Sequence, residues 1–253
     1  MRFAALGSGS RGNSWLVEAG RTRVLIDCGF GPRETSRRLQ RLGVEPASIV
    51  AIAVTHDHSD HLGGAVACAR RFGWDLYMTH GSAMAERRGL QAGEFSLIES
   101  HVAFHVGDLH LNPFTVPHDA REPVQFVVSD GDRRLGIVTD AGHVTPHMIS
   151  ALDVCDALVL ECNHDRDLLQ RGSYPRALKQ RIAGRWGHLD NEAAAGLLAV
   201  IDRSRLNQLV AAHLSEENNR PELACAALAT VLGCAPDWIA VANQDQGLDW
   251  RDV

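Results

Sequence analysis

The sequence predicts an α/β fold, a four-layer αββα sandwich that forms one domain over residues 1–253. Two groups of strand patterns, before residue 80 and after residue 100, occur together with helical patterns and predict two β-rich halves flanked by helices. The composition agrees, because 45% hydrophobic and 22% charged residues are ordinary values for a globular chain. A length of 253 residues is near the upper limit for one hydrophobic core.

The first half opens with strands. Strand patterns over residues 2–6 and 14–18 flank the glycine-rich loop 7–13, and a further strand is expected at 23–27. Residues 35–42 and 63–72 have helical spacing, and residues 76–79 have a strand pattern. Between the two helices, residues 49–55 form a continuous apolar run that ends in a cluster of histidines. We therefore expect this cluster where a buried strand meets a loop.

The second half contains a new set of strands. Alternating patterns at residues 101–104, 109–116, 124–129 and 134–139 predict a mainly antiparallel group. Apolar runs at 157–161 and 209–212 predict buried strands. Helices are predicted at 175–184, at 221–233, and from a cap at Asp190 or Asn191 to residue 203.

Charge and cysteine patterns limit the classes of protein. No apolar run is long enough for a secretory signal or a membrane span, so we expect a cytoplasmic protein with no membrane partner. Six scattered cysteines without a C-x-x-C pair are expected to be reduced core residues. The net charge of −6 is unusual for a nucleic-acid enzyme, although residues 164–188 carry a local excess of four positive charges. On charge alone, a solvated helical face is the preferred interpretation of that excess.

Residues 55–64 carry the strongest chemical signal. Three histidines and two aspartates fall within six positions: His56, Asp57, His58, Asp60 and His61. Clustered imidazoles and carboxylates are costly to bury unless a partner neutralises them, and a divalent metal ion is such a partner. Because a loop can direct alternate side chains to two neighbouring ions, His56 and His58 can serve one ion while Asp60 and His61 serve the other.

Three later strand patterns end in matching residue types. The strands predicted at 109–116, 134–139 and 209–212 lead to His118, Asp140 and His213, respectively. Each of these residues alone would be an ordinary polar side chain at a strand end. Their shared placement indicates that they complete a metal site.

The pattern H-x-H-x-D-H with a later His, Asp and His resembles the signature of the metallo-β-lactamase superfamily, and the resemblance spans nearly the whole chain. It implies the αββα fold and two divalent metal ions. The implied ligands are His56, His58 and His118 for the first ion, Asp60, His61 and His213 for the second, and Asp140 as a bridge. Nitrogen and oxygen ligands suit zinc, manganese or iron.

Asp140 and three further segments narrow the resemblance. It implies that true β-lactamases lack this bridging carboxylate, whereas nucleases, other phosphodiesterases and glyoxalase-type thioesterases keep it. Residues 158–165, 187–191 and 213–219, with the opening 8–14, resemble the YycJ/WalJ-like branch, whose members are thought to be 5′ to 3′ DNA exonucleases. Cys162 and Asp190 differ from the serines expected at those two positions, and neither is a metal ligand in this interpretation.

The resemblance leads to a mechanistic hypothesis in which a hydroxide that bridges two ions attacks phosphorus in line. Asp60 and Asp140 orient that hydroxide. A weaker similarity to ribonuclease Z gives His188, oriented by Glu161, the task of donating a proton to the departing sugar oxygen. The alternative for His188 is a loop residue that precedes a helix. Four residues of the same segments are assigned as substrate contacts: Asn163, His164, Ser215 and Asn218. For His164, a structural hydrogen bond is an equal alternative.

Two other classes of function stay open at this point. The main alternative is a small-molecule metallohydrolase, such as a cyclic-nucleotide or other phosphodiesterase, a thioesterase, a lactonase or a weak β-lactamase. The second is a protein that keeps the fold for binding or regulation, against which the complete ligand set argues. The expected partner is nucleic acid, with DNA preferred over RNA. The sequence leaves open the physiological metal, the strand polarity and the oligomeric state.

Overall fold

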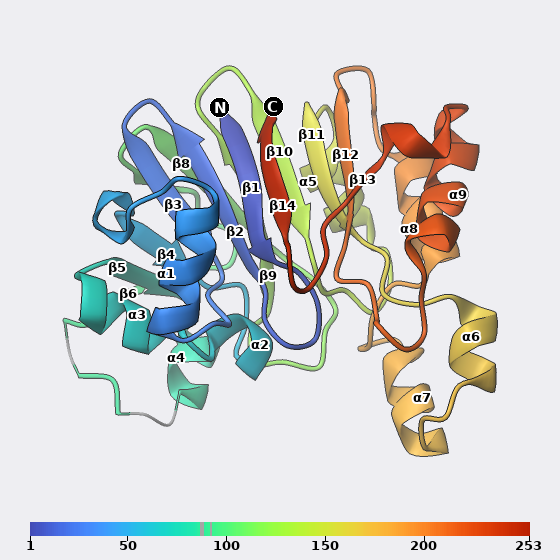
Figure 1. The fold of residues 1–253 in the computed structure, drawn as a ribbon, viewed down its shortest axis with the longest axis horizontal. Helices are drawn as coiled ribbons and strands as arrows, with labels where there is room; N and C mark the ends of the chain where they lie inside the picture. The colour runs from blue at the N-terminus through green and yellow to red at the C-terminus, as the bar shows by residue number, and fades with distance from the viewer. Residues whose placement is uncertain (87–88, 92) are drawn as a thin grey trace.

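The computed structural model describes residues 1–86, 89–91 and 93–253. Within these residues the chain forms two seven-stranded sheets that pack against each other, with helices on their outer surfaces (Figure 1). The predicted four-layer αββα sandwich is therefore confirmed. The two chain ends lie side by side (Figure 1), and the backbone N–H of Val253 donates to the carbonyl of Met1 at 3.0 Å.

The first sheet combines the strands of the N-terminal half with the last strand of the chain. Its members are β1 (Arg2–Gly7), β2 (Ser14–Ala19), β3 (Thr22–Ile26), β4 (Ala51–Ala53), β5 (Asp75–Met78), β6 (Ser96–Leu97) and β14 (Leu248–Asp252). The order across the sheet is β14, β1, β2, β3, β4, β5 and β6. Pairing is antiparallel from β14 to β3 and parallel from β3 to β6. The carboxyl ends of β3 and β4 consequently meet at one edge.

The second sheet holds the other strands in sequence order. They are β7 (Phe104–Val106), β8 (Leu109–Thr115), β9 (Val124–Ser129), β10 (Arg134–Val138), β11 (Ala157–Glu161), β12 (Gln208–Ala212) and β13 (Ala240–Val241). Pairing is antiparallel from β7 to β10, as predicted, and parallel from β10 to β13. β8, β10, β11 and β12 therefore all run in the same direction, and their carboxyl ends meet at one edge.

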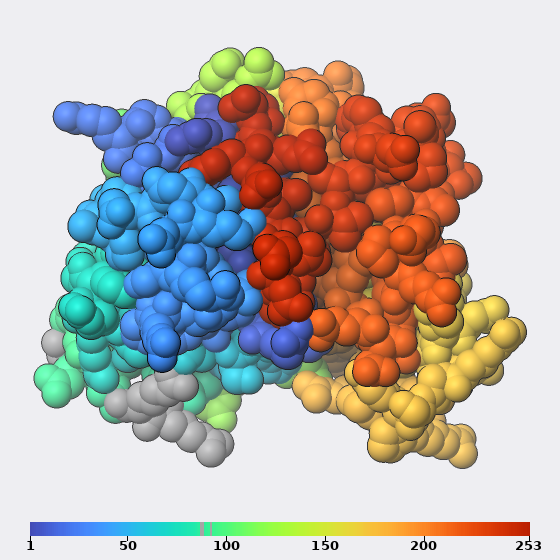
Figure 2. All heavy atoms as spheres, viewed as in Figure 1, coloured from blue at the N-terminus to red at the C-terminus, as the bar shows by residue number. Residues whose placement is uncertain are grey.

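Helices cover the outer face of each sheet. They are α1 (Pro32–Arg41), α2 (Ser59–Leu62), α3 (Ala65–Phe72), α4 (His80–Ala85), α5 (Pro146–Leu152), α6 (Arg166–Arg171), α7 (Arg176–Ile182), α8 (Asn191–Val200) and α9 (Pro221–Leu232). Residues of α1 and α3 share a core with the first sheet, and residues of α5, α8 and α9 share one with the second. α6 and α7 project beyond the strand ends at the lower right of Figure 1, where the gold atoms of Figure 2 protrude.

A third apolar core lies between the two sheets. Phe3 and Trp15 from the first sheet and Phe126 from the second are fully buried in it. Strands with helices on one face and the opposite sheet on the other are mainly apolar, and all five residues of β11 are buried, including the terminal Glu161. These strands are rigid supports for the residues that follow them.

Most predicted elements are present, with shifted boundaries. The strand expected at residues 101–104 is instead β7, Phe104–Val106. The helix expected to reach residue 203 ends at Val200, and Asp190 is its cap, since its Oδ1 accepts from the N–H of Ala193 at 2.7 Å. The sequence interpretation contained no counterpart of α5, α6 or β14. These elements are short, which leaves few residues to show a period.

The cysteines and the lengths of the helices bear on the expectations of reduced cysteines and of no membrane span. All six cysteines are unpaired, and only Cys234 is partly exposed. No helix in the described part of the chain is long and apolar enough to cross a membrane.

Gly64 marks a close approach between the loop after β3 and the start of α3. A Cβ atom at Gly64 would lie 1.8 Å from the carbonyl oxygen of Phe30, whereas a Cβ at Gly196 in α8 would meet nothing within 4 Å. We expect Gly64→Ala to lower the free energy of unfolding by about 1–3 kcal/mol, because the backbone must move. Gly196→Ala should raise it by roughly 0.5–1 kcal/mol, since alanine is the better helix former. Urea unfolding of both variants measures this, and equal stability of Gly64→Ala and the wild type would refute the first expectation.

Candidate metal centre

Five polar residues stand at strand ends along one edge of the sandwich. His56 follows β4, while His118, Asp140 and His213 follow β8, β10 and β12, and Glu161 ends β11. The structure brings all seven predicted ligands together in groups whose candidate ligand atoms lie within 4.8 Å of one another. These groups are His56, His58 and His118; Asp60, His61 and His213; His56, His61 and Asp140; and Asp140, Glu161, His188 and His213.

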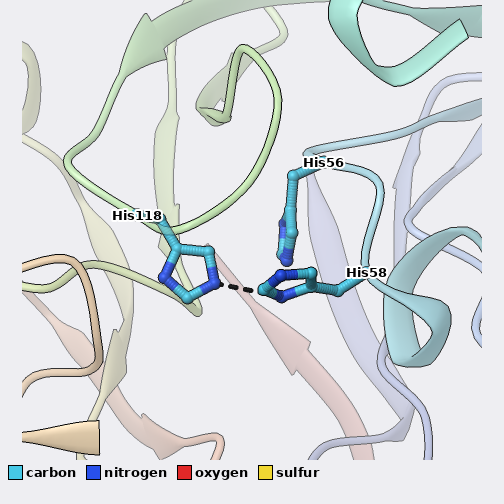
Figure 3. Close-up of side chains that lie close together, drawn as sticks. All are labelled: His56, His58 and His118. Carbon is cyan, nitrogen blue, oxygen red and sulfur yellow. Dashed lines mark hydrogen bonds between the residues drawn. The ribbon is translucent and has the colours of Figure 1, made fainter. Parts of the chain in front are cut away.

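His56, His58 and His118 point their rings toward one another (Figure 3). His58 Nε2 lies 3.2 Å from the carbonyl oxygen of Asp119, and His118 Nδ1 lies 2.9 Å from that of Gly187. Because a carbonyl oxygen can only accept, each of these nitrogens carries a hydrogen. In the neutral rings, His58 Nδ1 and His118 Nε2 then face each other at 3.2 Å with lone pairs. A cation beside both nitrogens satisfies this arrangement.

The third ring of this group is held in the same way. The hydroxyl of Thr55 donates to the carboxylate of Asp27, at 2.9 Å from Oδ2, so its oxygen accepts from His56 Nδ1 at 2.8 Å. His56 Nε2 is therefore left with its lone pair. Burial also lowers the pKa of His56 well below its usual value, which keeps the ring neutral.

His61 and Asp60 form the core of the second group. His61 Nδ1 donates to Asp27 Oδ2 at 2.8 Å, which turns Nε2 toward Asp60 and Asp140, 3.2 and 3.0 Å away. A carboxylate behind a histidine is a common way to orient a metal-binding imidazole. Asn13 adds a support from the glycine-rich loop, because its amide donates to Asp60 Oδ2 at 3.0 Å.

Three buried atoms of the cluster have no hydrogen-bond partner among the described residues: His56 Nε2, Asp140 Oδ2 and His213 Nε2. Asp140 Oδ2 lies 3.0 Å from His61 Nε2, but the contact lacks hydrogen-bond geometry. A buried polar atom without a partner costs about 1–3 kcal/mol. Divalent cations would satisfy all three atoms, so the residues present fit two such ions.

The electrostatic balance also favours cations. Burial would lower the pKa of His213, but the charge of Asp140 and the close contacts with the carboxylates of Asp60 and Glu161 raise that pKa to about 9. Burial would raise the pKa of Asp140, but His213 and His61 hold it well below its usual range. Without metal ions, protons on the imidazoles balance the carboxylates. A bound cation takes the place of those protons.

Glu161 connects this cluster to His188. Its Oε1 accepts from His188 Nδ1 at 2.7 Å and lies 3.4 Å from His213 Nδ1, while its Oε2 accepts from the N–H groups of Ala141 and Leu189. Burial would lower the pKa of His188, but the negative charge of Glu161 and the contact with Asp140 raise that pKa to about 10. The Nε2 atom of His188 is the ring nitrogen left free to act on a bound molecule.

A cavity of about 370 Å³ opens over the cluster. Its lining, among the described residues, is Ser10, His58, Ser59, Asp60, Asp119, Asp140, Tyr174, Leu178, Arg181, Ile182, Gly187, His188 and His213. Ligand-type residues and a segment around α7 therefore share one space.

The four residues assigned as substrate contacts do not belong to this lining. Asn163, His164 and Asn218 are buried, and Ser215 is half-buried. Asn163 Nδ2 donates to the carbonyl of His213 at 3.2 Å, and the hydroxyl of Ser215 accepts from the N–H of Asn218 at 3.1 Å. In the structure these side chains support the loops after β11 and β12, so the substrate-contact assignment has no geometric support.

Three supporting residues were absent from the predicted site. Asp27 holds His61, Asn13 holds Asp60, and Asp119 positions His58 through its carbonyl. Asp27 follows β3 as a strand-end carboxylate, has a positive φ of 62° and is fully buried. The sequence could have identified Asp27 by its place at the end of a strand, because the same observation identified Asp140.

The local positive charge of residues 164–188 is partly neutralised. Arg166 pairs with Asp190, Arg171 with Asp167, and Arg181 with Asp119. Lys179 donates to two backbone carbonyls. Three of the six cationic side chains of this segment therefore pair with a carboxylate of the protein, which supports the interpretation as a helical surface.

The chain is similar to proteins of known family and to proteins of known structure. Residues 22–213 match the family model of the β-lactamase superfamily domain. Exodeoxyribonuclease WalJ of Streptococcus pneumoniae is 33% identical over 229 residues, covering 88% of this chain and 85% of that protein. Exodeoxyribonuclease YycJ of Bacillus anthracis is 32% identical over 235 residues, covering 92% and 89%. Among solved structures, the metallo-β-lactamase fold protein YhfI of Bacillus subtilis superposes with a TM-score of 0.74 at 14% identity, over 99% of this chain and 98% of YhfI.

Asp27→Asn tests the orientation of His61. If the amide oxygen stays on the N–H of Thr55, the new NH₂ group faces His61 Nδ1 and moves the ring hydrogen to Nε2. We expect zinc affinity to fall by about 10- to 100-fold, the usual loss for an outer partner of a metal-binding histidine. A chelator competition measures it, with Asp249→Asn, at a side chain that is 90% exposed, as the control. Wild-type affinity in Asp27→Asn would show that this carboxylate does not orient a ligand.

Proposed function

The chain belongs to the metallo-β-lactamase superfamily of metal-dependent hydrolases, and we propose that its substrate is DNA, which it shortens from the 5′ end as an exonuclease. The observation that carries the proposal is the match to two exodeoxyribonucleases at 32–33% identity over 88–92% of the chain. The predicted ligand cluster lies inside that span. The polarity of cleavage rests on the sequence resemblance.

The proposed cofactor is a pair of divalent ions, zinc or manganese, with iron as a further option. His56, His58 and His118 would hold one ion, Asp60, His61 and His213 the other, and Asp140 would contact both. When bound, two such ions supply an activated water and the positive charge that a phosphodiester needs during in-line displacement. With the ions bound, the carboxylates of Asp60 and Asp140 would orient that water toward phosphorus.

His188 is the proposed proton donor. Its Nδ1 is fixed by Glu161 at 2.7 Å, and its side chain is partly exposed in the cavity wall. Nε2 can therefore approach a bound phosphodiester and protonate the departing sugar oxygen. Because Glu161 also faces His213, one carboxylate sets the position of the donor relative to the ligand cluster.

End-labelled DNA tests the proposed function. Protein reconstituted with manganese or zinc is incubated with DNA carrying the label at either end, and with RNA, a thioester, a lactone and a β-lactam. A 5′ to 3′ exonuclease releases a 5′ label at once in small products and shortens 3′-labelled strands progressively. His58→Ala should abolish this cleavage, because it removes a ligand. Rapid turnover of a small ester without DNA cleavage would replace the proposal with a small-molecule hydrolase.

His188→Ala separates proton donation from metal binding. We expect kcat on DNA to fall by about 10²- to 10⁴-fold with metal content unchanged, since general acid catalysis is worth that much. Asp140→Ala should lose both activity and metal. Rates and bound metal are measured on the same samples, with His101→Ala as an exposed-histidine control. Unchanged turnover in His188→Ala would remove this residue from the mechanism.

A further inference from the structure

One part of the cavity wall differs in chemistry from the ligand cluster. Tyr174, Leu178, Arg181 and Ile182 all line the cavity, and all come from α7 or the two residues before it. Leu178, Arg181 and Ile182 are spaced as i, i+3 and i+4, so they lie on the same face of the helix. We call these four residues the α7 wall. The cavity thus combines imidazoles and carboxylates with an aromatic, apolar and cationic surface.

Tyr174, the aromatic member of the α7 wall, is available to contact a bound molecule. The ring of Tyr174 is half-buried, and its hydroxyl has no hydrogen-bond partner among the described residues. The side chain of Arg181 is 60% exposed, and its guanidinium donates to Asp119, which itself lies beside His58. A base can stack on such a ring, and a phosphate can pair with such a guanidinium.

The α7 wall is fixed relative to the proposed proton donor. The N–H of His188 donates to the carbonyl of Ile182 at 2.9 Å, and a Cβ at Gly187 would lie 2.1 Å from that same oxygen. From the middle of the helix, Lys179 Nζ donates to the carbonyls of Gln170 and Gly172, which lie before α7. α7 therefore holds its side chains at a defined distance from His188, although the α6–α7 region protrudes from the body of the protein (Figure 2).

We propose that the α7 wall holds one unstacked nucleotide beside the scissile phosphate, with the base on the ring of Tyr174 and a neighbouring phosphate on Arg181. This inference rests on the proposed function, since it names the part of the DNA that enters the site. A volume of about 370 Å³ is near the lower end of small-ligand pockets, about 300–1,000 Å³, and suits a single nucleotide. The end of the DNA strand that is cleaved must therefore separate from the complementary DNA strand before cleavage.

Base removal tests the role of Tyr174. DNA substrates carry either a normal or an abasic residue at each of the two positions that flank the first scissile phosphate. Wild-type kcat/KM should be roughly 5- to 150-fold higher for the normal end at one of these positions, the range that base–aromatic stacking gives. Tyr174→Leu should lose this preference, and Tyr174→Phe should keep it because the ring remains.

The outcomes separate this inference from the proposed function. DNA cleavage without any preference for a base, or an equal loss on both substrates in Tyr174→Leu, overturns the stacking role and leaves the exonuclease intact. No cleavage of either DNA by the metal-loaded wild type overturns the proposed function itself. Metal content and the melting temperature of each variant show that the centre and the fold are retained.

Salt dependence tests the role of Arg181. A guanidinium that pairs with phosphate contributes about one unit to the slope of log(kcat/KM) against log(salt concentration), or about 0.7 for a single strand. Arg181→Ala should reduce the slope by that amount, whereas Arg21→Ala, at an exposed turn, should not. An unchanged slope in Arg181→Ala would mean that Arg181 pairs with Asp119 and with no phosphate of the DNA.

Discussion

Each ligand-type imidazole around the cavity has one ring nitrogen held by an acceptor from the protein, so that the other nitrogen faces the centre. The acceptors come from different parts of the chain: the carboxylates of Asp27 and Glu161, the hydroxyl of Thr55, and the carbonyls of Asp119 and Gly187. The orientation of the rings therefore depends on the relative position of both sheets and their loops. This constraint explains why the cluster lies at strand ends, where two rigid sheets fix the spacing.

Glu161 contacts two histidines of this arrangement at the same time. It contacts His213, which faces the ligand cluster, and His188, which faces the cavity. Its second oxygen accepts from two backbone N–H groups, so the carboxylate cannot rotate without losing them. A buried carboxylate that is fixed on four sides transmits the geometry of β11 to both histidines, so the strand sets the distance between the ligand cluster and His188.

The sequence predicted the sandwich and the ligand cluster because both depend on strong local patterns. Apolar runs that end in histidine or aspartate identify strand ends without knowledge of the fold. Asp27 was missed because a single carboxylate after a strand is an ordinary turn residue until His61 is seen beside it. Asn163, His164 and Asn218 were assigned to substrate from motif likeness, and the structure buries them outside the lining of the cavity. Tyr174 and Arg181 could not be recognised, since only the folded chain brings α7 over the cavity.

The pairing of β14 with β1 has a consequence for biosynthesis. Of the strands in the two sheets, β1 is synthesised before all the others, and its neighbour β14 is synthesised after all the others. Until then one side of β1 is an open edge, the kind of surface that recruits strands from other molecules. The same late segment contains Gln244, which binds the backbone of Arg11 and Gly12 in the loop that carries Asn13. A chain that lacks Gln244 and β14 would thus expose an unpaired edge of β1 and lose the contacts that brace the loop of Asn13, so both solubility and assembly of the centre would depend on this late segment.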